Sequence, residues 1–476
     1  MSRLTKVTTY LVTHLGQVLY DYLLEQKVRV DSLYSKLGFG SLGKVLNLDS
    51  LRTTLPTSAG QVAYVLSSSS VTDTQKHFGG GVFESYIYPA GSVDDGGMII
   101  IPATGTLGWR RINYEKVYLE YFGAIGDGVY DSTSAILKAM DYGKRNNTTI
   151  FAGAGVFETS SAIPVWDRSG LVGVGRDQTI FEKTTNNQYQ IATGVAVDAF
   201  MCVLARTYAP DGTSAEDYAT LVNLEGFTLR RKGITGRENA VQYGVWAMKL
   251  AASRLNNIRV ECGHFGFWGE DVFSNTFENL QLLGLGVGQY CGFQISRYRS
   301  GVYSLSGTSN VMNLIGIANY QFGFILDSMQ YSTMNSCTAD GIRPMQGTTE
   351  TFSSAYSFHN PHGIVMNGCG SEGVSGARLN VVMDGFAVYE GTLTINSYQG
   401  QIVQENPKVS TPMWRVDGTG ATKFCSISLF NCNLKKDASL SNQTVGYMTG
   451  SLVQVFNVGS VIDPPSTGGG ATFKSL

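Results

Sequence analysis

The sequence predicts an all-β fold in which short strands repeat along the chain and stack into a solenoid. The 476 residues include 57 Gly and only 11 Pro, a composition typical of many short strands joined by tight turns. A hydrophobic core rarely grows beyond about 250–300 residues, so this length requires several domains or a repeat architecture. After about residue 220 the sequence repeats irregularly, which favours the repeat.

The N-terminal part is expected to hold two small pieces before the repeat begins. Residues 1–40 are predicted to contain a short helix or a weak coiled-coil seam, because apolar side chains recur there at Leu4, Leu11, Leu15, Val18 and Tyr22. The glycine-rich stretch 38–44 ends this segment. Residues 41–115 combine short apolar runs with turn residues, as in MIIIPATG before GWRRI, and are expected to form a small β module.

A helix and a short strand are predicted between residues 121 and 157. Asp131 or Ser132 can cap a helix, and the apolar positions that follow them have helical spacing, at Ile136, Leu137 and Met140. The strand TTIFA comes next.

The segments around this helix resemble a known family. FGAIGDGVYDSTSAI, followed by IFAGAGVF, is similar to the opening signature of the pectate-lyase-like right-handed β-helix proteins, which are common in bacteriophage tailspikes. Family members often have Pro where this chain has Ala152 or Ala154, a departure that concerns only a turn. By the resemblance, Asp127 and Asp131 are structural residues that hold the turn and the helix cap.

The resemblance covers roughly residues 75–400 and implies a domain organisation. It implies a right-handed parallel β-helix, a single-stranded solenoid, over residues 116–400, which binds and cleaves a glycan. Residues 401–476 would form a C-terminal β segment that closes a homotrimer, since strand-like alternation continues there. Residues 41–115 would attach the protein to the virion.

The same resemblance implies the function of a phage tailspike that recognises and depolymerises a bacterial surface polysaccharide, such as a capsule, an O-antigen or an exopolysaccharide. Its partners would be that polysaccharide, two further copies of the chain, and other phage tail proteins bound through the N-terminal segment. The protein would be made in the host cytoplasm and would end in the tail of the virion. Specificity for one glycan depends on loop side chains, so the glycan is not predicted.

Recurring segments after residue 220 define the coils of the predicted solenoid. SRLNNIRVECG, SNTFENLQLLG, SNVMNLIGIAN, YSTMNSCTADG and HGIVMNGCGSEG align on Asn257, Asn279, Asn313, Asn335 and Asn367. Stacked coils place aligned residues about 4.8 Å apart along the axis. We expect the Asn residues to form an amide ladder at a turn, and Cys337 and Cys369, two positions later, to lie in the core.

The position five residues after each Asn carries the first candidate for chemistry. Its occupants are Cys262, Gly284, Ala318, Asp340 and Glu372, so two successive coils carry carboxylates. Carboxyl groups on neighbouring coils can reach the roughly 5–9.5 Å separation of glycoside hydrolysis, one as acid and one as nucleophile or base. Their proximity raises one of the two pKa values and keeps a general acid protonated. Asp340 and Glu372 are therefore predicted to be catalytic; alternatively, both are turn residues before Gly.

A second alignment supplies further acidic candidates. Matching Gly266, Gly292, Gly323 and Ala355 brings into one column Glu270, Ser296, Asp327 and His359. Asp327 with Glu270 is the second catalytic candidate. Glu261 is the third, since it lies one residue from the first column and a strand shift of one residue would turn it to the other face.

Aromatic and cationic side chains in the same coils are candidates for binding substrate. Trp268 and Tyr331 neighbour the proposed acidic columns, and their flat rings can pack on sugar rings. Arg343 can bind carboxylate or hydroxyl groups, and His359 belongs to the second column. The insertion 343–355 is a loop of the type that walls a groove on a regular solenoid.

Two other functions would use the same fold. A polysaccharide lyase would use Tyr331, His359 or His362 as its base, with Arg343 or a metal to neutralise a uronate. A non-catalytic fibre or adhesin would bind glycan without cutting it. No Asp cluster has the spacing expected of a calcium-dependent pectate lyase, so we expect no metal and no other cofactor.

Charge and composition argue against other classes of partner. Charged residues make up 15% of the chain and the formal net charge is -2, so no basic surface for nucleic acid is expected. No apolar run approaches about 20 residues, so no membrane insertion is expected. The seven Cys are scattered and lack metal-ligand spacing, as is typical of buried thiols in a protein made in the cytoplasm.

Overall fold

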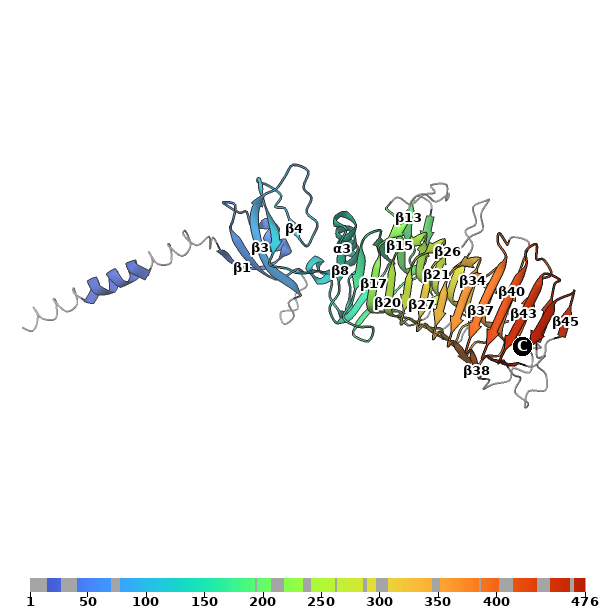
Figure 1. Ribbon diagram of the computed structural model, residues 1–476. Coiled ribbons are helices and arrows are strands. Elements are labelled where there is room, and N and C mark those ends of the chain that lie inside the picture. The colour runs from blue at the N-terminus through green and yellow to red at the C-terminus, as the bar shows by residue number, and fades with distance from the viewer. Residues whose placement is uncertain are drawn as a thin grey trace, which may run out of the picture. The chain divides into compact units, whose positions relative to one another are not determined.

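A computed structural model of the chain shows two compact units, each built mainly of β-strands (Figure 1). The first consists of residues 1–116 and 120–124, and the second of residues 117–119 and 125–476. The structure describes residues 15–26, 41–69, 78–192, 195–206, 218–233, 241–261, 263–285, 289–296, 307–344, 352–384, 387–401, 414–434, 446–462 and 466–475.

Residues 15–26 form a helix, which confirms the predicted helical segment near the N-terminus. Its apolar side chains are exposed, as the values for Leu15 (63%) and Tyr22 (57%) show. Leu4 and Leu11, which extend the predicted apolar seam, lie outside the described residues. Among the described helices, none combines the length and the hydropathy that crossing a membrane requires.

The N-terminal unit contains a five-stranded sheet in the order β1-β2-β3-β5-β4. Its strands are β1 (Ser41–Asn47), β2 (Val62–Ser67), β3 (Gly79–Ile87), β4 (Ile99–Ile100) and β5 (Leu107–Ile112), with helix α2 (Leu48–Thr53) after β1. A small core forms around the buried side chains of Phe83 and Trp109, with Leu51 from α2. This unit has its own core, so the small β module expected here is present as a sheet with one short helix.

Helix α3 (Thr133–Asn146) belongs to the first part of the second unit and lies where the sequence predicts it. Ile136 and Met140 are buried, as their spacing requires. Ser132 occupies the N-cap position, but its side chain makes no capping bond. Asp131, the residue before it, caps the first turn instead, because its Oδ1 accepts a hydrogen bond from the backbone N–H of Thr133 at 2.9 Å. Asp127 accepts from the backbone N–H groups of residues 129 and 130, so both aspartates hold the turn and the cap as expected.

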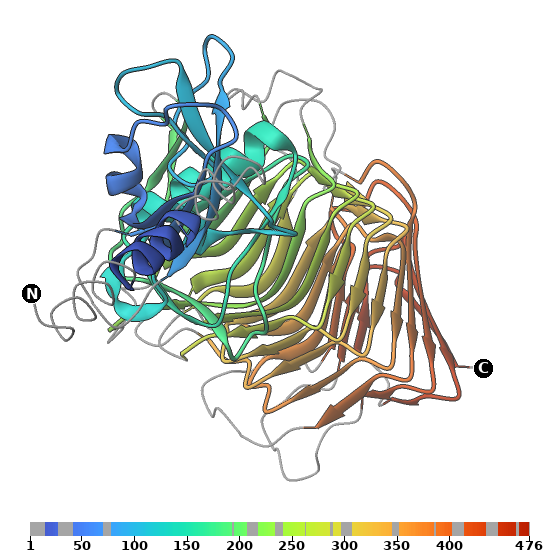
Figure 2. The same cartoon turned by 90° about the vertical axis from the view of Figure 1, so that its left-hand side faces the viewer.

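The second unit is a parallel β-helix, which confirms the predicted fold class. One face is an 11-stranded parallel sheet formed by β10 (Ile163–Trp166), β15 (Ala199–Leu204), β18 (Val241–Met248), β21 (Gly263–Glu270), β25 (Cys291–Ser296), β29 (Phe322–Asp327), β33 (Ser354–His359), β36 (Ala377–Val382), β39 (Trp414–Asp417), β42 (Gly446–Thr449) and β45 (Ser466–Gly468). Figure 2 shows these coils stacked one behind another.

The remaining faces of the solenoid form a second, 28-stranded sheet. Its early strands are β6 (Val117–Tyr118), β7 (Asp127–Asp131), β8 (Thr149–Phe151), β9 (Gly155–Thr159), β11 (Gly170–Val172), β12 (Thr179–Lys183), β16 (Ala219–Thr220), β17 (Asn223–Arg231), β19 (Leu250–Ala251), β20 (Arg254–Glu261), β22 (Val272–Phe273), β23 (Thr276–Glu278), β24 (Gln281–Leu283), β26 (Gly307–Thr308), β27 (Val311–Asn313) and β28 (Gly316–Ala318). A 3₁₀ helix, η1 (Leu119–Phe122), and a hairpin of β13 (Tyr189–Ala192) and β14 (Val195–Val197) lie between early strands.

The later strands of this sheet continue to the C-terminal end of the chain. They are β30 (Met329–Gln330), β31 (Thr333–Asn335), β32 (Thr338–Asp340), β34 (His362–Asn367), β35 (Gly370–Glu372), β37 (Gly391–Asn396), β38 (Gln399–Gln401), β40 (Cys425–Phe430), β41 (Asn433–Leu434), β43 (Val453–Val458), β44 (Val461–Ile462) and β46 (Thr472–Ser475). Strands from residue 414 onward pair in parallel with the coils before them. The described part of 401–476 therefore extends the solenoid instead of forming a separate segment.

Left-handed backbone conformations turn the chain at the corners of each coil. In the coil of β29–β32 the corner residues have positive φ values: Ser328 (54°), Tyr331 (41°), Ser336 (51°) and Gly341 (61°). Such conformations are costly for residues with a side chain, but each corner lets one strand end and the next begin in a new direction. The corners divide a coil into its faces.

The interior of the solenoid is filled by side chains that stack from coil to coil. Phe267, Phe293, Phe324 and Tyr356 occupy matching positions in neighbouring strands, and their ring centroids are 4.7, 5.9 and 5.1 Å apart in turn. Cys337 and Cys369 are buried in adjacent coils, which confirms that they are core residues. A continuous core is thus shared by neighbouring coils.

The predicted asparagine ladder is present, with a shift of one residue. Asn313, Asn335, Asn367 and Asn396 stack in register, and each later amide donates to the one before it at 2.8–2.9 Å. Asn257 and Asn279 also stack, at 3.2 Å, but they are themselves corner residues with positive φ. In later coils the corner comes one residue after the Asn, because Leu314 and Ser336 take that conformation.

We expect Asn335→Ala to destabilise the solenoid, because Asn335 both donates to Asn313 and accepts from Asn367. Losing two bonds and leaving two half-buried amides without partners should lower the free energy of unfolding by roughly 1–3 kcal/mol. Asn396→Ala is the matched control, since Asn396 donates one ladder bond, to Asn367. Thermal and urea unfolding measure both, and equal destabilisation would contradict the ladder's role.

Candidate active site

A column of residues runs along one edge of the solenoid, where strands of the 28-stranded sheet end. These residues lie in register on successive coils and are called the edge column: Asp131, Glu158, Glu182, Arg230, Glu261, Leu283, Ala318, Asp340, Glu372 and Gln401. It contains Ala318, Asp340 and Glu372 in the predicted order. It is therefore the column in which the sequence placed the first catalytic candidates.

In the first two coils the predicted column was wrong by one residue, because the residue before the predicted one occupies the column. Glu261 lies in register with Leu283 and Ala318, so it belongs to the edge column instead of lying beside it. Gly284 follows the column position, and Cys262 lies outside the described residues. The cause is the position of the left-handed corner residue. In the earlier coil this residue is Asn279 itself, whereas in the later coil it is Leu314, one residue after the aligned Asn, so a position counted from the Asn is displaced by one residue between the two coils.

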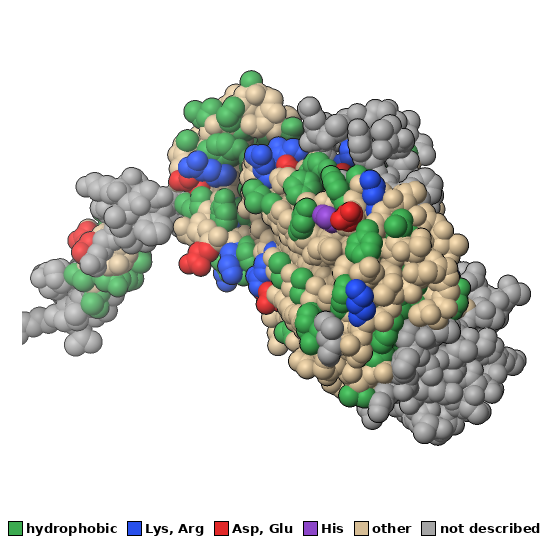
Figure 3. Space-filling model, turned by 45° about the vertical axis from the view of Figure 1, so that its right-hand side comes forward, with side chains coloured by type: hydrophobic (Ala, Val, Ile, Leu, Met, Phe, Trp, Pro, Cys, Tyr) green, Lys and Arg blue, Asp and Glu red, His purple; other side chains and the backbone are tan. Residues whose placement is uncertain are grey.

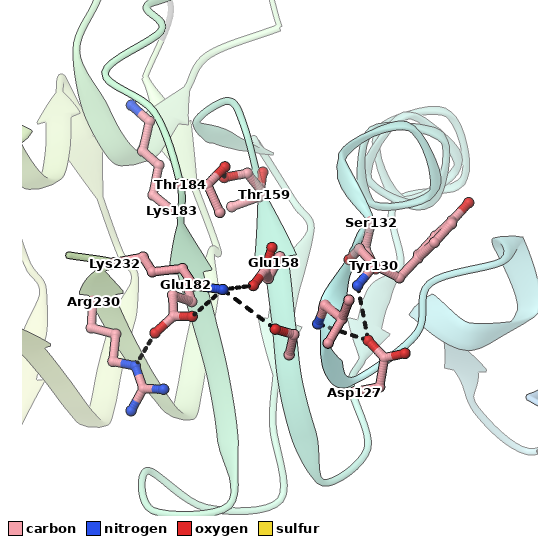
Figure 4. A network of polar contacts seen from close by, with 12 residues as sticks. Asp127, Tyr130, Ser132, Glu158, Thr159, Glu182, Lys183, Thr184, Arg230 and Lys232 are labelled. Atoms are coloured by element: carbon pink, nitrogen blue, oxygen red, sulfur yellow. Dashed lines mark hydrogen bonds and ion pairs between the residues drawn. The ribbon is translucent and has the colours of Figure 1, made fainter.

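Glu158 and Glu182 form a first pair of neighbouring carboxylates in the edge column (Figure 4). They are only 7% and 8% exposed, and both are matched by cations. Lys232 bonds Glu158 and lies 3.8 Å from Glu182, and Arg230 Nε lies 2.7 Å from Glu182. Pairing with Glu158 raises the pKa of Lys232. Carboxylates held in this way are part of an ion-pair network that joins neighbouring coils.

Asp340 and Glu372 form a second pair, with different surroundings. They lie opposite each other on β32 and β35, and the backbone N–H of Glu372 donates to Asp340 Oδ1 at 3.1 Å. Both line two surface hollows, of about 300 Å³ and about 460 Å³. The other residues of the first hollow are Asn319, Gly341, Arg343, Gly373 and Ser375, and those of the second are Thr338, Gly370, Ser371, Gln399, Gly400 and Asn433.

The two carboxyl groups of this pair differ in their environment. Asp340 is partly buried, whereas Glu372 is exposed. Burial raises the pKa of Asp340, and the negative charge of Glu372 adds to this rise. A carboxyl group with a raised pKa retains its proton to higher pH, which is what a general acid requires. The pair thus offers one group suited to donating a proton and one that remains open to solvent.

Hydrophobic and uncharged side chains predominate on the solenoid face shown in Figure 3. This agrees with the low share of charged residues in the whole chain, 15%. Where charges are sparse, two stacked carboxylates that line a hollow are an unusual feature. Structural ion pairing accounts for Glu158 and Glu182, while Asp340 has a raised pKa, which indicates the opposite electrostatic balance.

The second predicted column is also present in the 11-stranded sheet. Glu270 lies opposite Ser296, and Asp327 lies opposite His359. Ser296 separates Glu270 from Asp327, so these two acids do not sit on neighbouring coils. Glu270 is only 8% exposed. Asp327 and Glu270 are therefore less suited than Asp340 and Glu372 to flank one glycosidic bond.

Trp268 lies on the outer side of the 11-stranded sheet and packs within an aromatic cluster. Its ring stacks on Trp246, with centroids 5.9 Å apart and planes at 13°, and is 5.4 Å from Tyr243. It is half-buried against the buried cluster that contains Cys202 and Leu204. Packing therefore accounts for most of the Trp268 ring.

Tyr331 and Arg343 fall on different corners of the coil. Arg343 lines the first hollow with Asp340 and Glu372, as the sequence suggested. Tyr331 lies between β30 and β31, where its hydroxyl bonds His362 Nε2 at 2.9 Å. The residues proposed for a lyase, Tyr331 with Arg343, are thus not brought together. Of the insertion 343–355, residues 345–351 lie outside the described residues.

No group of three or more His, Cys, Asp or Glu side chains in the described ranges could hold a metal ion. The six Cys that the structure describes are buried free thiols. Burial raises the pKa of Cys202 to about 12, so this thiol stays protonated and unreactive at neutral pH.

Comparisons with known proteins give the chain its context. Residues 44–114 match the family model of the phage tail protein small four-stranded beta-sheet domain. The chain is similar to the gp42 tailspike of Acinetobacter phage vb_AbaP_AS12, with a TM-score of 0.68 and 17% identity, over 91% of this chain and 74% of that one. The chain has the parallel β-helix fold of phage tailspikes.

Two further tailspikes share this fold. They are the enzymatically active domains of tailspike proteins 4 and 2 of bacteriophage CBA120, with TM-scores of 0.56 and 0.52 and identities of 15% and 14%. The matches cover 93% and 85% of this chain, but only 55% and 60% of those chains. At such identities the likeness concerns the fold of the tailspikes and not their residues.

Sequence reasoning missed two groups of residues. Glu158 and Glu182 escaped notice because the repeat was aligned only after residue 220, although Phe157-Glu158 and Phe181-Glu182 are a repeated dipeptide one coil apart. Tyr389 was missed for another reason. It contacts His362 from a loop before β37, a position that no repeat in the sequence indicates.

We expect Lys232→Ala to lower Tm, because it leaves the nearly buried Glu158 and Glu182 without their shared cation. Arg254→Ala is the matched control: Arg254 also bridges two glutamates, Glu225 and Glu278, but their side chains are 35% and 37% exposed. Calorimetry should show a clearly larger loss for Lys232→Ala.

The same effect should depend on pH. Because the folded state raises the pKa of Lys232, its stabilisation is complete at neutral pH and is lost as the pH rises through that raised value. The Tm difference between the unsubstituted chain and Lys232→Ala should therefore shrink above about pH 10.4. A difference that grows at alkaline pH would contradict the pairing.

Proposed function

We propose that this chain is a phage tailspike that recognises a bacterial surface polysaccharide and depolymerises it by endo-glycosidic hydrolysis. The observation that carries the proposal is the register of Asp340 opposite Glu372 on adjacent coils, beside two open hollows. Adjacent coils lie about 4.8 Å apart, and side chains can widen that spacing to the roughly 5–9.5 Å used by paired carboxylates on a glycosidic bond. The polysaccharide would be a capsule, an O-antigen or an exopolysaccharide.

In this proposal the two carboxyl groups have separate roles. Asp340 donates its proton to the leaving glycosidic oxygen, since burial and the charge of Glu372 raise its pKa. Glu372 is exposed and acts as the nucleophile or activates water. Arg343 lines the same hollow and can bind sugar hydroxyl or carboxylate groups. If Glu372 is the nucleophile, water then attacks the glycosyl–Glu372 ester and gives its proton to the Asp340 carboxylate, which releases the sugar and restores both groups. If Glu372 activates water instead, water displaces the leaving group in one step, and the proton that Glu372 takes up returns to solvent. Neither route uses a metal or another cofactor.

Two similarities support a role in a phage tail, one of the N-terminal unit and one of the whole chain. The N-terminal unit matches a phage tail domain model, and the whole chain has the fold of tailspikes, two of which are described as enzymatically active. By this reasoning residues 44–114 dock on another tail protein, and the protein belongs to the tail of the virion after synthesis in the host cytoplasm. A homotrimer with the glycan as its ligand is part of the same proposal.

We expect Asp340→Asn and Glu372→Gln each to reduce depolymerisation by about 100-fold or more, since each removes one acid–base group. The assay incubates the full chain with a panel of purified capsular and O-antigen polysaccharides and follows new reducing ends. Absorbance from an unsaturated uronate would indicate a lyase instead, and binding without any cleavage would indicate an adhesin.

The matched control for these variants is Glu278→Gln, which changes a partly exposed carboxylate that pairs with Arg254 on another face of the solenoid. It should retain full activity. Asp340→Asn should keep or raise Tm at neutral pH, because a carboxyl group with a raised pKa destabilises the folded state when it ionises. Full activity in both Asp340→Asn and Glu372→Gln would remove the pair from the mechanism.

The pH dependence of cleavage follows from the raised pKa of Asp340. A general acid works only while protonated, so kcat/KM should fall as the pH rises through that pKa. The fall should begin above the usual range of an Asp, which lies near about pH 3.9. A pH profile of initial rates measures this limb, and a rate that stays constant from about pH 4 to about pH 9 would contradict the role of Asp340.

A further inference from the structure

An exposed group of three rings lies on the solenoid away from the hollows of Asp340. Tyr331 follows β30, His362 begins β34, and Tyr389 precedes β37, so the rings come from three successive coils. The ring centroids of Tyr331 and His362 are 5.0 Å apart, and those of His362 and Tyr389 are also 5.0 Å apart. We call these residues the ring cluster.

Hydrogen bonds hold the ring cluster in one arrangement. The Nδ1 of His362 lies 2.6 Å from the backbone oxygen of residue 390, and this oxygen can only accept, so Nδ1 carries the proton. In the neutral imidazole the other nitrogen, Nε2, is then an acceptor, and the hydroxyl of Tyr331, 2.9 Å away, donates to it. The Tyr331 ring is thereby fixed before any ligand arrives, and its oxygen keeps lone pairs for a ligand.

The backbone is arranged to accommodate the Tyr331 ring. Tyr331 has a φ of 41°, an uncommon conformation for an aromatic residue that carries an energetic cost. Beside it, Gly363 has no side chain, and a Cβ there would lie 2.9 Å from Cδ1 of Tyr331. The coil therefore provides space for the ring on its surface, where it does not contribute to the core.

The rings of the cluster remain open to solvent in spite of this fixation. The exposed fraction is 62% for Tyr331 and 48% for Tyr389, while Phe324 and Tyr356, which stack inside the same coils, are fully buried. Exposed, fixed and flat surfaces with polar rims suit a ligand that has both apolar faces and hydroxyl groups. A pyranose ring has this chemistry. The planes of Tyr331 and His362 are inclined at 70° and those of His362 and Tyr389 at 30°, so the cluster offers both ring faces and ring edges to a ligand.

We propose that Tyr331, His362 and Tyr389 form an accessory glycan-binding site, separate from the hollows of Asp340, against which sugar rings of a polysaccharide pack. The inference rests on the proposed function in one respect, namely that the ligand is a polysaccharide. A long chain bound there stays attached while another part of it reaches the groove, which raises its effective concentration at the site of cleavage. Short fragments that cannot span both sites gain nothing.

The first test measures binding with the full chain carrying Asp340→Asn, which leaves the polymer intact. The probes are purified bacterial capsular and O-antigen polysaccharides and oligosaccharides prepared from them by mild acid. We expect Tyr331→Ala and Tyr389→Ala each to weaken binding of the polymer by roughly fivefold to tenfold. Tyr447→Ala, at another exposed tyrosine of the solenoid (42%), is the matched control and should bind as before.

The second test separates binding from catalysis in the active chain. The two tyrosine variants should raise KM for the polymer by a similar factor, with kcat unchanged and with unchanged cleavage of short oligosaccharides. Tm and the oligomeric mass from light scattering accompany each variant. Should Tyr331→Ala fail to fold, Tyr389→Ala carries the same comparison.

The outcomes separate this inference from the proposed function. Unchanged polymer affinity in both variants overturns the accessory site, and so does a changed oligomeric mass with unchanged affinity, which would assign the ring cluster to contacts between copies. If the unsubstituted chain binds the polymer without cleaving it, only the proposed hydrolysis is contradicted. The tyrosine variants then still test the accessory site through polymer affinity. A chain that binds no polysaccharide overturns both.

Discussion

In-register parallel pairing between successive coils is the constraint on which this structure depends. Each coil hydrogen-bonds to the next with matching positions opposite each other, so a side chain is stacked on its counterpart about 4.8 Å away. This rule produces the aromatic column of the core, the asparagine ladder and the edge column alike. As a consequence, side chains of the same kind lie next to each other. Such contacts stabilise aromatic rings and amides, whereas two like charges must either pair with an opposite charge or undergo a shift in pKa.

The two acidic pairs of the edge column show both responses to that constraint. Glu158 and Glu182 have Lys232 and Arg230 within reach, so two buried charges become part of an ion-pair network. Asp340 instead has a neighbouring carboxylate and partial burial, and its pKa rises. The same stacking geometry thus stabilises the early coils and supplies a candidate general acid in the later ones. At the corner with Tyr331 the stacking of coils has a third result, because there it brings together the aromatic rings of the ring cluster on the surface of the solenoid.

Some features followed from local sequence because their cause is local. The spacing of Ile136 and Met140 and the cap at Asp131 specify α3. The recurring segments that align on Asn indicate a solenoid. The pairing of Asp340 with Glu372 was also predictable, because their coils share the same corner position after the Asn. The offset at Glu261 was not, since the chain turns at Asn279 in one coil and one residue later, at Leu314, in the next. Both Asn and Leu occur at that corner, so the sequence alone does not indicate which residue adopts the left-handed conformation.

The sequence therefore specified the stacked β-fold, the order of its coils and a pair of acids on neighbouring coils, since these depend on periodic patterns within the chain. Tertiary structure decided which charges are neutralised, because Lys232, which follows β17, reaches past β12 to Glu158 on β9, a contact that no spacing in the sequence predicts. It also decided that Tyr331 contacts His362, which in turn contacts Tyr389, whereas Arg343 lines the hollow of Asp340. Side-chain direction at a corner is set by the left-handed backbone and by neighbours from other coils, and these come together only when the coils are stacked.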